Sequence, residues 1–98
     1  MEKLTSSARK NLRSQAHHLK PVVMVGRNGV SEQLIASVNA ALKDHELIKV
    51  KFLDFKEEKK EISGEIAVVT KSELVGIIGN IAIFYRRHPQ PEMRKIKL

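Results

Sequence analysis

The sequence predicts an α/β fold with the element order α-β-α-β-α-β-β, and three observations carry this prediction. Apolar residues recur at helical spacing in residues 5–19 and 32–44. Short apolar or alternating runs, typical of strands, separate these helical segments. Gly79 and Asn80 lie between two such runs and have the composition of a two-residue hairpin turn. Strand–helix–strand alternation favours parallel pairing and the hairpin adds an antiparallel pair, so we expect one four-stranded mixed sheet.

Composition limits the chain to one small basic domain. Its 98 residues include 18 Lys and Arg against 11 Asp and Glu, a formal net charge of +7, and no cysteine. We therefore expect a single domain over residues 1–98, without disulfides, thiolate metal sites or cysteine catalysis. Such a basic domain favours a polyanionic partner. The sequence shows no signal-peptide pattern and no apolar run of membrane-spanning length, which predicts a cytoplasmic protein without a membrane partner.

The first predicted helix, residues 5–19, has an apolar stripe and a basic flank. Its apolar residues recur at spacings of three and four: Leu4, Ala8, Leu12, Ala16 and Leu19. At about 100° per residue, most cations fall on one side of this stripe: Lys3, Arg9, Lys10, Arg13, His17 and Lys20. A one-sided basic flank suits a phosphate backbone. The alternative is an ordinary solvated helix surface.

The most informative stretch follows a predicted strand at residues 22–25. It is the G-x-x-G turn Gly26-Arg27-Asn28-Gly29, after which Ser31 has the composition and place of a helix N-cap. Backbone N–H groups at a helix N-terminus, beside Arg27, can hold a phosphate oxygen. Glycines also let a nucleic-acid backbone approach closely. The alternative is that these residues only turn the chain from strand to helix.

The second predicted strand, residues 47–53, alternates apolar residues with Lys49 and Lys51. One of its faces is therefore expected to be buried, while the two lysines face solvent or a ligand. The remaining predicted elements are strands at 74–78 and 81–87 and an extended tail at 88–98.

Residues 56–71 fit two patterns. Ile62, Ile66 and Val69 keep helical spacing, but Ile62, Gly64, Ile66 and Val68 also fit the alternation of a strand. Gly64 is unfavourable inside a helix. The interleaved glutamates and lysines at the start of the segment favour a solvated helix, and a helix is the prediction.

Motifs of the common enzyme classes are missing from the sequence. It contains no G-x-S-x-G nucleophile elbow, no P-loop and no G-x-G-x-x-G. The four histidines lack the i, i+4 spacing of helical metal ligands. We therefore expect no enzymatic activity, no catalytic residue, no metal or other cofactor, and no small-molecule substrate.

Aromatic residues are too few for base stacking on a sheet. Phe52 and Phe84 fall at expected core positions, and Tyr85 is the one strand aromatic with a polar tip. Modules that stack bases on a sheet expose two or three aromatic residues there. Clamping of the RNA backbone by a G-x-x-G loop, as in KH domains, fits better. In KH domains that loop joins two helices, so the similarity is one of mechanism.

The stretch LKPVVMVGRNGVSEQLIASVNAALKDHELIKVK and a closing YRR resemble the CRM domain. This RNA-binding module is named for chloroplast RNA splicing and ribosome maturation, and its stand-alone bacterial members are the YhbY-type proteins. The resemblance covers Leu4 to about Arg87 and leaves out the tail after Pro89. It implies a compact two-layer α/β sandwich similar to the C-terminal domain of bacterial initiation factor three, with 56–71 helical. It also implies RNA binding through Gly26–Gly29, and association with precursors of the large ribosomal subunit.

Residues and resemblance together predict a protein that binds ribosomal RNA of large-subunit precursors during assembly. Its affinity is expected to come mostly from the phosphate backbone. The expected RNA contacts are Gly26, Arg27, Asn28, Gly29, Arg9, Lys10, Arg13, Lys20, Lys49, Lys51, Arg86 and Arg87. The alternative is a protein-docking module whose basic face binds an acidic protein partner.

Overall fold

The computed structural model describes residues 4–97 and contains the predicted elements in the predicted order. The helices and strands are α1 (Ser6–Ala16), β1 (Val23–Val25), α2 (Glu32–His45), β2 (Leu47–Phe52), α3 (Lys59–Thr70), β3 (Glu73–Ile78) and β4 (Ile81–Tyr85), followed by a 3₁₀ turn at Pro91–Met93. The segment 56–71, whose sequence fits both a helix and a strand, contains α3 and is therefore helical, as predicted.

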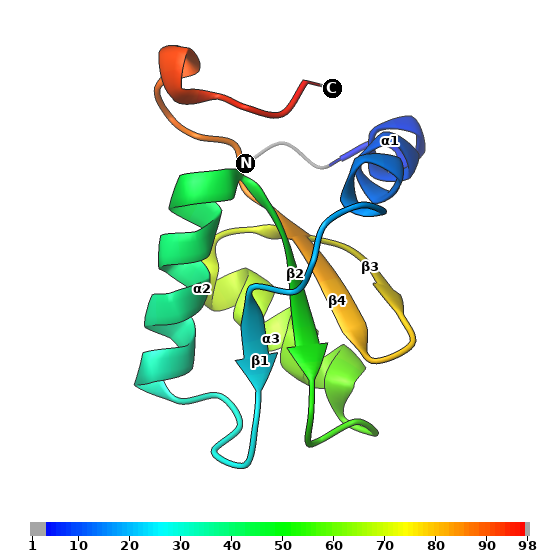
Figure 1. The fold of residues 1–98 in the computed structure, drawn as a ribbon, viewed down its shortest axis with the longest axis vertical. Coiled ribbons are helices and arrows are strands. Elements are labelled where there is room, and N and C mark those ends of the chain that lie inside the picture. Colours follow the sequence, from blue (N-terminus) through cyan, green and yellow to red (C-terminus); the bar gives the residue numbers. More distant parts are fainter. Residues whose placement is uncertain (1–3, 98) are drawn as a thin grey trace.

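The four strands form one mixed sheet in the order β1-β2-β4-β3. β1 pairs in parallel with β2, and Val25 lies opposite Phe52. β4 pairs antiparallel with both β2 and β3. α3 therefore connects β2 to β3, which are not neighbours in the sheet, and the hairpin at Gly79 brings β4 back between them. Because β1 and β2 point the same way, the loops that follow them lie together at one end of the molecule (Figure 1).

Helices cover the two faces of the sheet unequally. On one face, α2 and α3 form the predicted two-layer sandwich and enclose the larger core, with Val38, Ile66 and Phe52 near its centre. On the other face, α1 packs Leu12 and Ala16 against a smaller cluster that includes Ile83 and Tyr85. α1 is short, so it covers only part of this second face (Figure 1).

Some element boundaries differ from the prediction. α1 ends at Ala16 rather than at residue 19, because the chain tightens into a turn in which the Leu19 N–H donates to the Ala16 carbonyl at 2.9 Å. This turn takes Leu19 off the apolar stripe and leaves it exposed. The last strand ends at Tyr85 rather than at residue 87, because Tyr85 pairs with Leu47 and Glu73, the first residues of β2 and β3, and neither neighbouring strand extends further.

The tail is less extended than predicted, because Glu46 holds it against the domain. The Glu46 carboxylate accepts hydrogen bonds from the backbone N–H groups of His88 (2.7 Å), Ile96 (2.9 Å) and Lys95. Burial raises the pKa of Glu46, but these three donors and the nearby His88 lower it by more, so the net shift is downward. Ile96 then packs onto the smaller core cluster.

We expect Glu46→Gln to lower the free energy of unfolding by about 1–3 kcal/mol at neutral pH, since an amide satisfies these donors less well than a carboxylate. The folded-state pKa of Glu46 is depressed, so its contribution is full above the unfolded-state value of roughly 4.3 and is lost as pH falls through the folded-state value. Denaturant unfolding of both proteins at several pH values measures this. A difference that stays constant on acidification would contradict it.

Candidate nucleic-acid interface

The carboxyl end of β1 leads into a tight turn with Arg27 and Asn28 at its tip. The N–H of Gly29 donates to the carbonyl of Gly26 at 3.0 Å and closes this four-residue turn. Gly29 has a φ of +60°, which glycine adopts without a steric penalty. Both side chains at the tip are exposed. The turn therefore presents a cation and an amide on a defined backbone.

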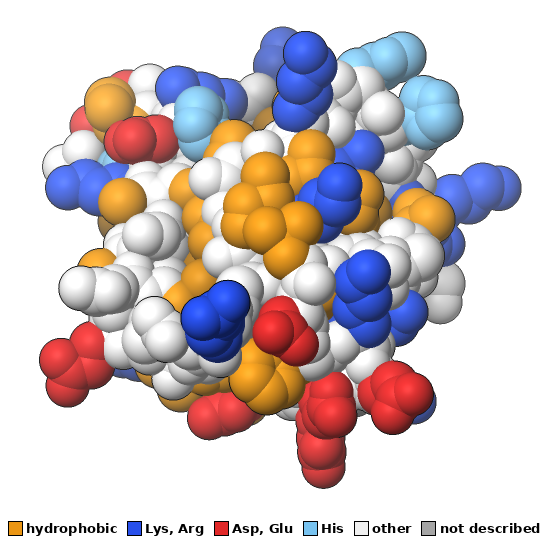
Figure 2. Space-filling model, turned by 60° about the horizontal axis from the view of Figure 1, so that its bottom comes forward, with side chains coloured by type: hydrophobic (Ala, Val, Ile, Leu, Met, Phe, Trp, Pro, Cys, Tyr) orange, Lys and Arg blue, Asp and Glu red, His pale blue; other side chains and the backbone are white. Residues whose placement is uncertain are grey.

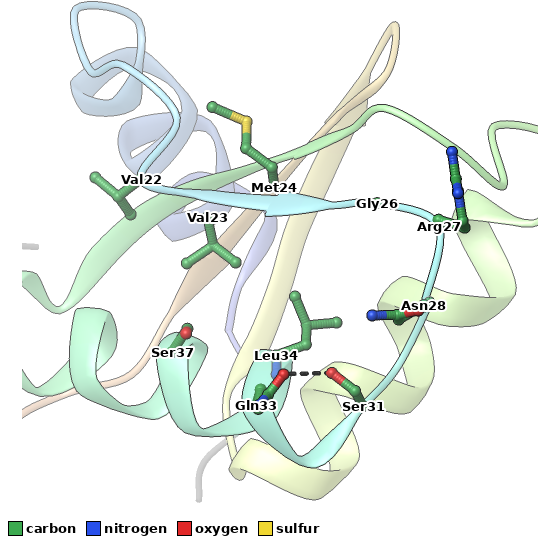
Figure 3. Close-up of a pocket in the computed structure, with 11 residues that line it drawn as sticks. Val22, Val23, Met24, Gly26, Arg27, Asn28, Ser31, Gln33, Leu34 and Ser37 are labelled. Atoms are coloured by element: carbon green, nitrogen blue, oxygen red, sulfur yellow. Dashed lines mark hydrogen bonds between the residues drawn. The ribbon is translucent and has the colours of Figure 1, made fainter.

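A hollow of about 340 Å³ lies between β1, this turn and the first part of α2. The Ser31 hydroxyl caps α2 by accepting a hydrogen bond from the Leu34 N–H at 3.0 Å. Asn28, Gln33 and Ser37 add polar groups to the lining. Figure 3 shows the Asn28 side chain turned toward the hollow and the Arg27 side chain pointing away from it. The turn therefore has an amide side, which faces the hollow, and a cationic side.

The connection between β2 and α3 packs against the same turn. The N–H groups of Leu53 and Asp54 both donate to the carbonyl of Val25, at 2.9 and 3.2 Å. The Phe55 ring lies against Gly29, where a Cβ atom would stand 3.3 Å from the ring. Sequence reasoning missed Phe55. Its only signal was an aromatic residue within an otherwise charged connection, because its position depends on this tertiary contact.

Three of the predicted cations lie on the sheet face that α1 leaves partly open. Lys51 is exposed, and the ammonium group of Lys49 donates to the His17 carbonyl at 3.5 Å. The Arg13 side chain passes over Gly76, where a Cβ atom would stand 3.4 Å from the arginine Cδ. Arg13, His17 and Lys49 together line a second hollow of about 220 Å³. The structure thus brings Arg13, Lys49 and Lys51 together.

Acidic residues mark the opposite border of this region. The exposed acids at the starts of α2 and α3 and in the connection before α3 are Glu32, Asp54, Glu57, Glu58 and Glu61. They outnumber the two exposed lysines among them, Lys56 and Lys60. Figure 2 shows most red side chains along the lower edge of this view and an orange patch in the middle, with blue side chains above the patch and also between it and the red ones. A polyanion at the turn is therefore attracted toward the α1 side of the sheet and repelled from the α3 side.

Arg86 lies at the other end of the molecule and is engaged there. Arg86 follows Tyr85, which pairs with Leu47 at the start of β2. The Gly26–Gly29 turn instead follows Val25, which lies opposite Phe52 at the end of β2. The Arg86 guanidinium donates to the Asn39 side chain (2.7 Å) and to the carbonyls of Thr70 (2.8 Å) and Asn39 (3.1 Å). Burial lowers the pKa of Arg86. The side chain joins α2 to α3.

Arg9 also has partners within the protein. Its guanidinium donates to the Leu74 carbonyl at 2.6 Å and lies 3.6 Å from the Glu73 carboxylate, which fixes α1 to β3. The other predicted contacts, Lys10, Lys20 and Arg87, are exposed on separate elements, and Lys3 lies outside the described residues. Within residues 4–97, no group of acidic and histidine side chains could hold a metal. In the same range, no helix is long and apolar enough to cross a membrane.

Comparisons with known proteins agree on one family. The sequence model of the CRS1/YhbY (CRM) domain matches residues 4–86. A probable RNA-binding protein of Pseudomonas aeruginosa is 42% identical over 89 residues, covering 90% of this chain and 86% of the relative. Probable RNA-binding protein YqeI of Bacillus subtilis is 36% identical over 96 residues, covering 97% and 98%. The solution structure of a hypothetical protein of Staphylococcus aureus superposes with a TM-score of 0.80 at 32% identity, covering 97% of this chain and all of that one.

The two loop glycines should respond differently to alanine. We expect Gly29→Ala to lower the free energy of unfolding by roughly 1–2 kcal/mol, because its φ is positive and the new methyl group meets the Phe55 ring. Gly26→Ala should change it by less than about 0.5 kcal/mol, since a Cβ atom there meets nothing within 4 Å. Denaturant unfolding of both variants tests this, and equal losses would contradict it.

Proposed function

The chain belongs to the CRS1/YhbY (CRM) domain family, and from this premise we propose that it binds RNA, with the Gly26–Gly29 turn in contact with the sugar–phosphate backbone. Relatives that carry RNA-binding names match the chain over 86% or more of its length, which supports RNA as the partner.

The observation that carries the proposed contact is the open space around Gly26. A Cβ atom at this position would meet nothing within 4 Å, although the residue borders the polar hollow. An RNA backbone can therefore approach the main chain closely here. One phosphate in the hollow would be held by the first-turn N–H groups of α2 and by Asn28. Arg27, on the other side of the turn, would bind a neighbouring phosphate.

The charges around the turn favour one course of the RNA strand over the protein surface. From Arg27 the strand would continue over Lys51, Lys49 and Arg13 on the partly open face of the sheet. Acidic side chains on the α3 side disfavour the opposite course (Figure 2). Arg9 and Arg86 are held by partners within the protein, so we assign them to the fold rather than to this path.

The finer proposal is that the RNA is ribosomal RNA in precursors of the large subunit, bound during assembly. Its support is the resemblance to stand-alone bacterial members of the family. A small domain that binds mainly phosphates has modest base specificity by itself. This role would place the protein in the cytoplasm.

Arg27→Ala tests the loop contact. We expect it to weaken binding to a structured ribosomal RNA fragment by about 1 kcal/mol or more and to reduce the salt slope by roughly one unit, since one phosphate contact is lost. Gly26→Ala should weaken binding without loss of stability, because its methyl group enters the space that the backbone would occupy. Fluorescence titrations at four salt concentrations measure both variants.

Lys43→Ala provides a matched control, because Lys43 is exposed near the far end of α2. It removes the same charge from the protein and should leave the affinity close to wild type. If Lys43→Ala weakens binding as much as Arg27→Ala does, only the overall charge matters and the turn is not the contact.

A basic hollow at the far end of the molecule supports the alternative of an acidic protein partner. It measures about 760 Å³, and its lining contains the cations Lys43, Lys71, Arg86 and Arg87 together with His88. Val69 and Met93 add exposed apolar surface. If this hollow carries the function, Lys43→Ala will impair binding of an acidic partner and Arg27→Ala will leave RNA binding unchanged.

A further inference from the structure

We propose that Phe55 stacks on an unpaired RNA base, so that the protein prefers single-stranded nucleotides at the Gly26–Gly29 turn. This inference rests on the proposed function, because it takes the position of the RNA backbone from the contact at the turn. It adds a base contact to a surface that otherwise contacts phosphates.

The first observation is the exposure of the Phe55 ring. Of the chain's three phenylalanines and one tyrosine, all within the described residues, Phe52 and Phe84 are fully buried and Tyr85 is nearly so. Phe55 is 37% exposed. It rests against Gly29, so the ring borders the turn to which we assign the backbone contact. A base attached to that backbone could reach it.

The second observation is the backbone conformation of Phe55. Its φ is +53°, a region that residues with a Cβ atom disfavour and that is exceptional for a bulky side chain. The Phe55 N–H donates to the Asp54 carboxylate at 2.8 Å, and its carbonyl accepts from the Glu58 N–H at 3.1 Å. Glycine or asparagine would form such a turn with less strain. Surface strain of this kind is concentrated at binding sites, where it places a side chain for a ligand.

The third observation is the exposed apolar surface on β1 and on the β2–α3 connection. Leu53, two residues earlier, is 55% exposed, and Met24 is exposed on β1 beside Lys51. Apolar surface next to cations matches single-stranded RNA, in which phosphates alternate with unstacked bases.

The charges near Phe55 favour a base over a phosphate at this point. Asp54, Glu57 and Glu58 lie in the same connection and outnumber its one lysine, Lys56, so its net charge is negative and disfavours a phosphate. A neutral base carries no such penalty. In a duplex, by contrast, the faces of the bases are covered by stacking, so the ring would have no partner. The site therefore favours unpaired RNA.

The test compares Phe55→Leu, Phe55→Tyr and wild type on a short single-stranded RNA that contains 2-aminopurine, and on the same sequence as a duplex. Wild type should bind the single strand more tightly and quench its fluorescence. Phe55→Leu should weaken that binding about fivefold or more and abolish the quenching, whereas Phe55→Tyr should retain both. The salt slope should stay unchanged, because no charge is removed.

Two controls make the outcome decisive. Val68→Ala removes apolar surface that is 78% exposed on α3 and should bind like wild type. Thermal unfolding verifies that each variant is folded. If Arg27→Ala weakens binding while Phe55→Leu binds and quenches like wild type, the stacking inference is wrong and the proposed function stands. If neither Arg27→Ala nor Gly26→Ala weakens binding, the proposed contact at the turn itself is wrong.

Discussion

The parallel pairing of β1 with β2 is the constraint on which the candidate site depends. It brings the carboxyl ends of both strands to one edge of the sheet, so the turn after β1 and the connection after β2 must meet there. The Val25 carbonyl then accepts two N–H groups from that connection, which fixes the two loops relative to each other. Glycine at position 29 follows from this geometry, because it supplies the positive φ of the turn and leaves space for the Phe55 ring. Each part of the surface is thereby positioned by backbone contacts rather than by flexible side chains.

The basic residues that give the protein its net charge of +7 have two different roles. Arg9 fixes α1 to the end of β3, and Arg86 joins α2 to α3 through three hydrogen bonds. Removing either side chain would take these hydrogen-bond donors away from buried or half-buried carbonyl groups, which costs stability whether or not RNA is present. Arg13, Lys49 and Lys51, by contrast, line the part of the sheet that α1 leaves open. A count of basic residues therefore overstates the surface available to a polyanion. Arg9 and Arg86 make hydrogen bonds of 2.6 to 3.1 Å within the protein, whereas Lys49 makes a single long one of 3.5 Å to the His17 carbonyl.

Much of the fold could be predicted from the sequence because its signals are local. Periodicities and short apolar runs located the seven α-helices and strands of residues 4–97, and the Ser31 cap and the Gly79 hairpin mark their ends correctly. Local patterns do not reveal long-range hydrogen bonds, so the tail was expected to be extended although Glu46 holds it through three backbone groups. The same limit applies to the site. The G-x-x-G turn is visible as a motif, whereas the position of Phe55 depends on a strained φ and on contact with a residue 26 positions away.

The proposed site would contact the phosphates and the bases of single-stranded RNA with different groups. The phosphate contacts that we propose at the turn and along β2 would give affinity that depends on salt and hardly on sequence. An aromatic ring gives affinity that depends on whether a base is free to stack, and it does so without adding charge. The β2–α3 connection would strengthen this separation, because Asp54, Glu57 and Glu58 outnumber its one lysine, Lys56, and the net negative charge disfavours phosphates there. A strand would therefore be oriented with its backbone toward the α1 side and one base toward α3. If both proposed contacts form, a domain of 98 residues distinguishes unpaired from paired RNA while recognising little of its sequence.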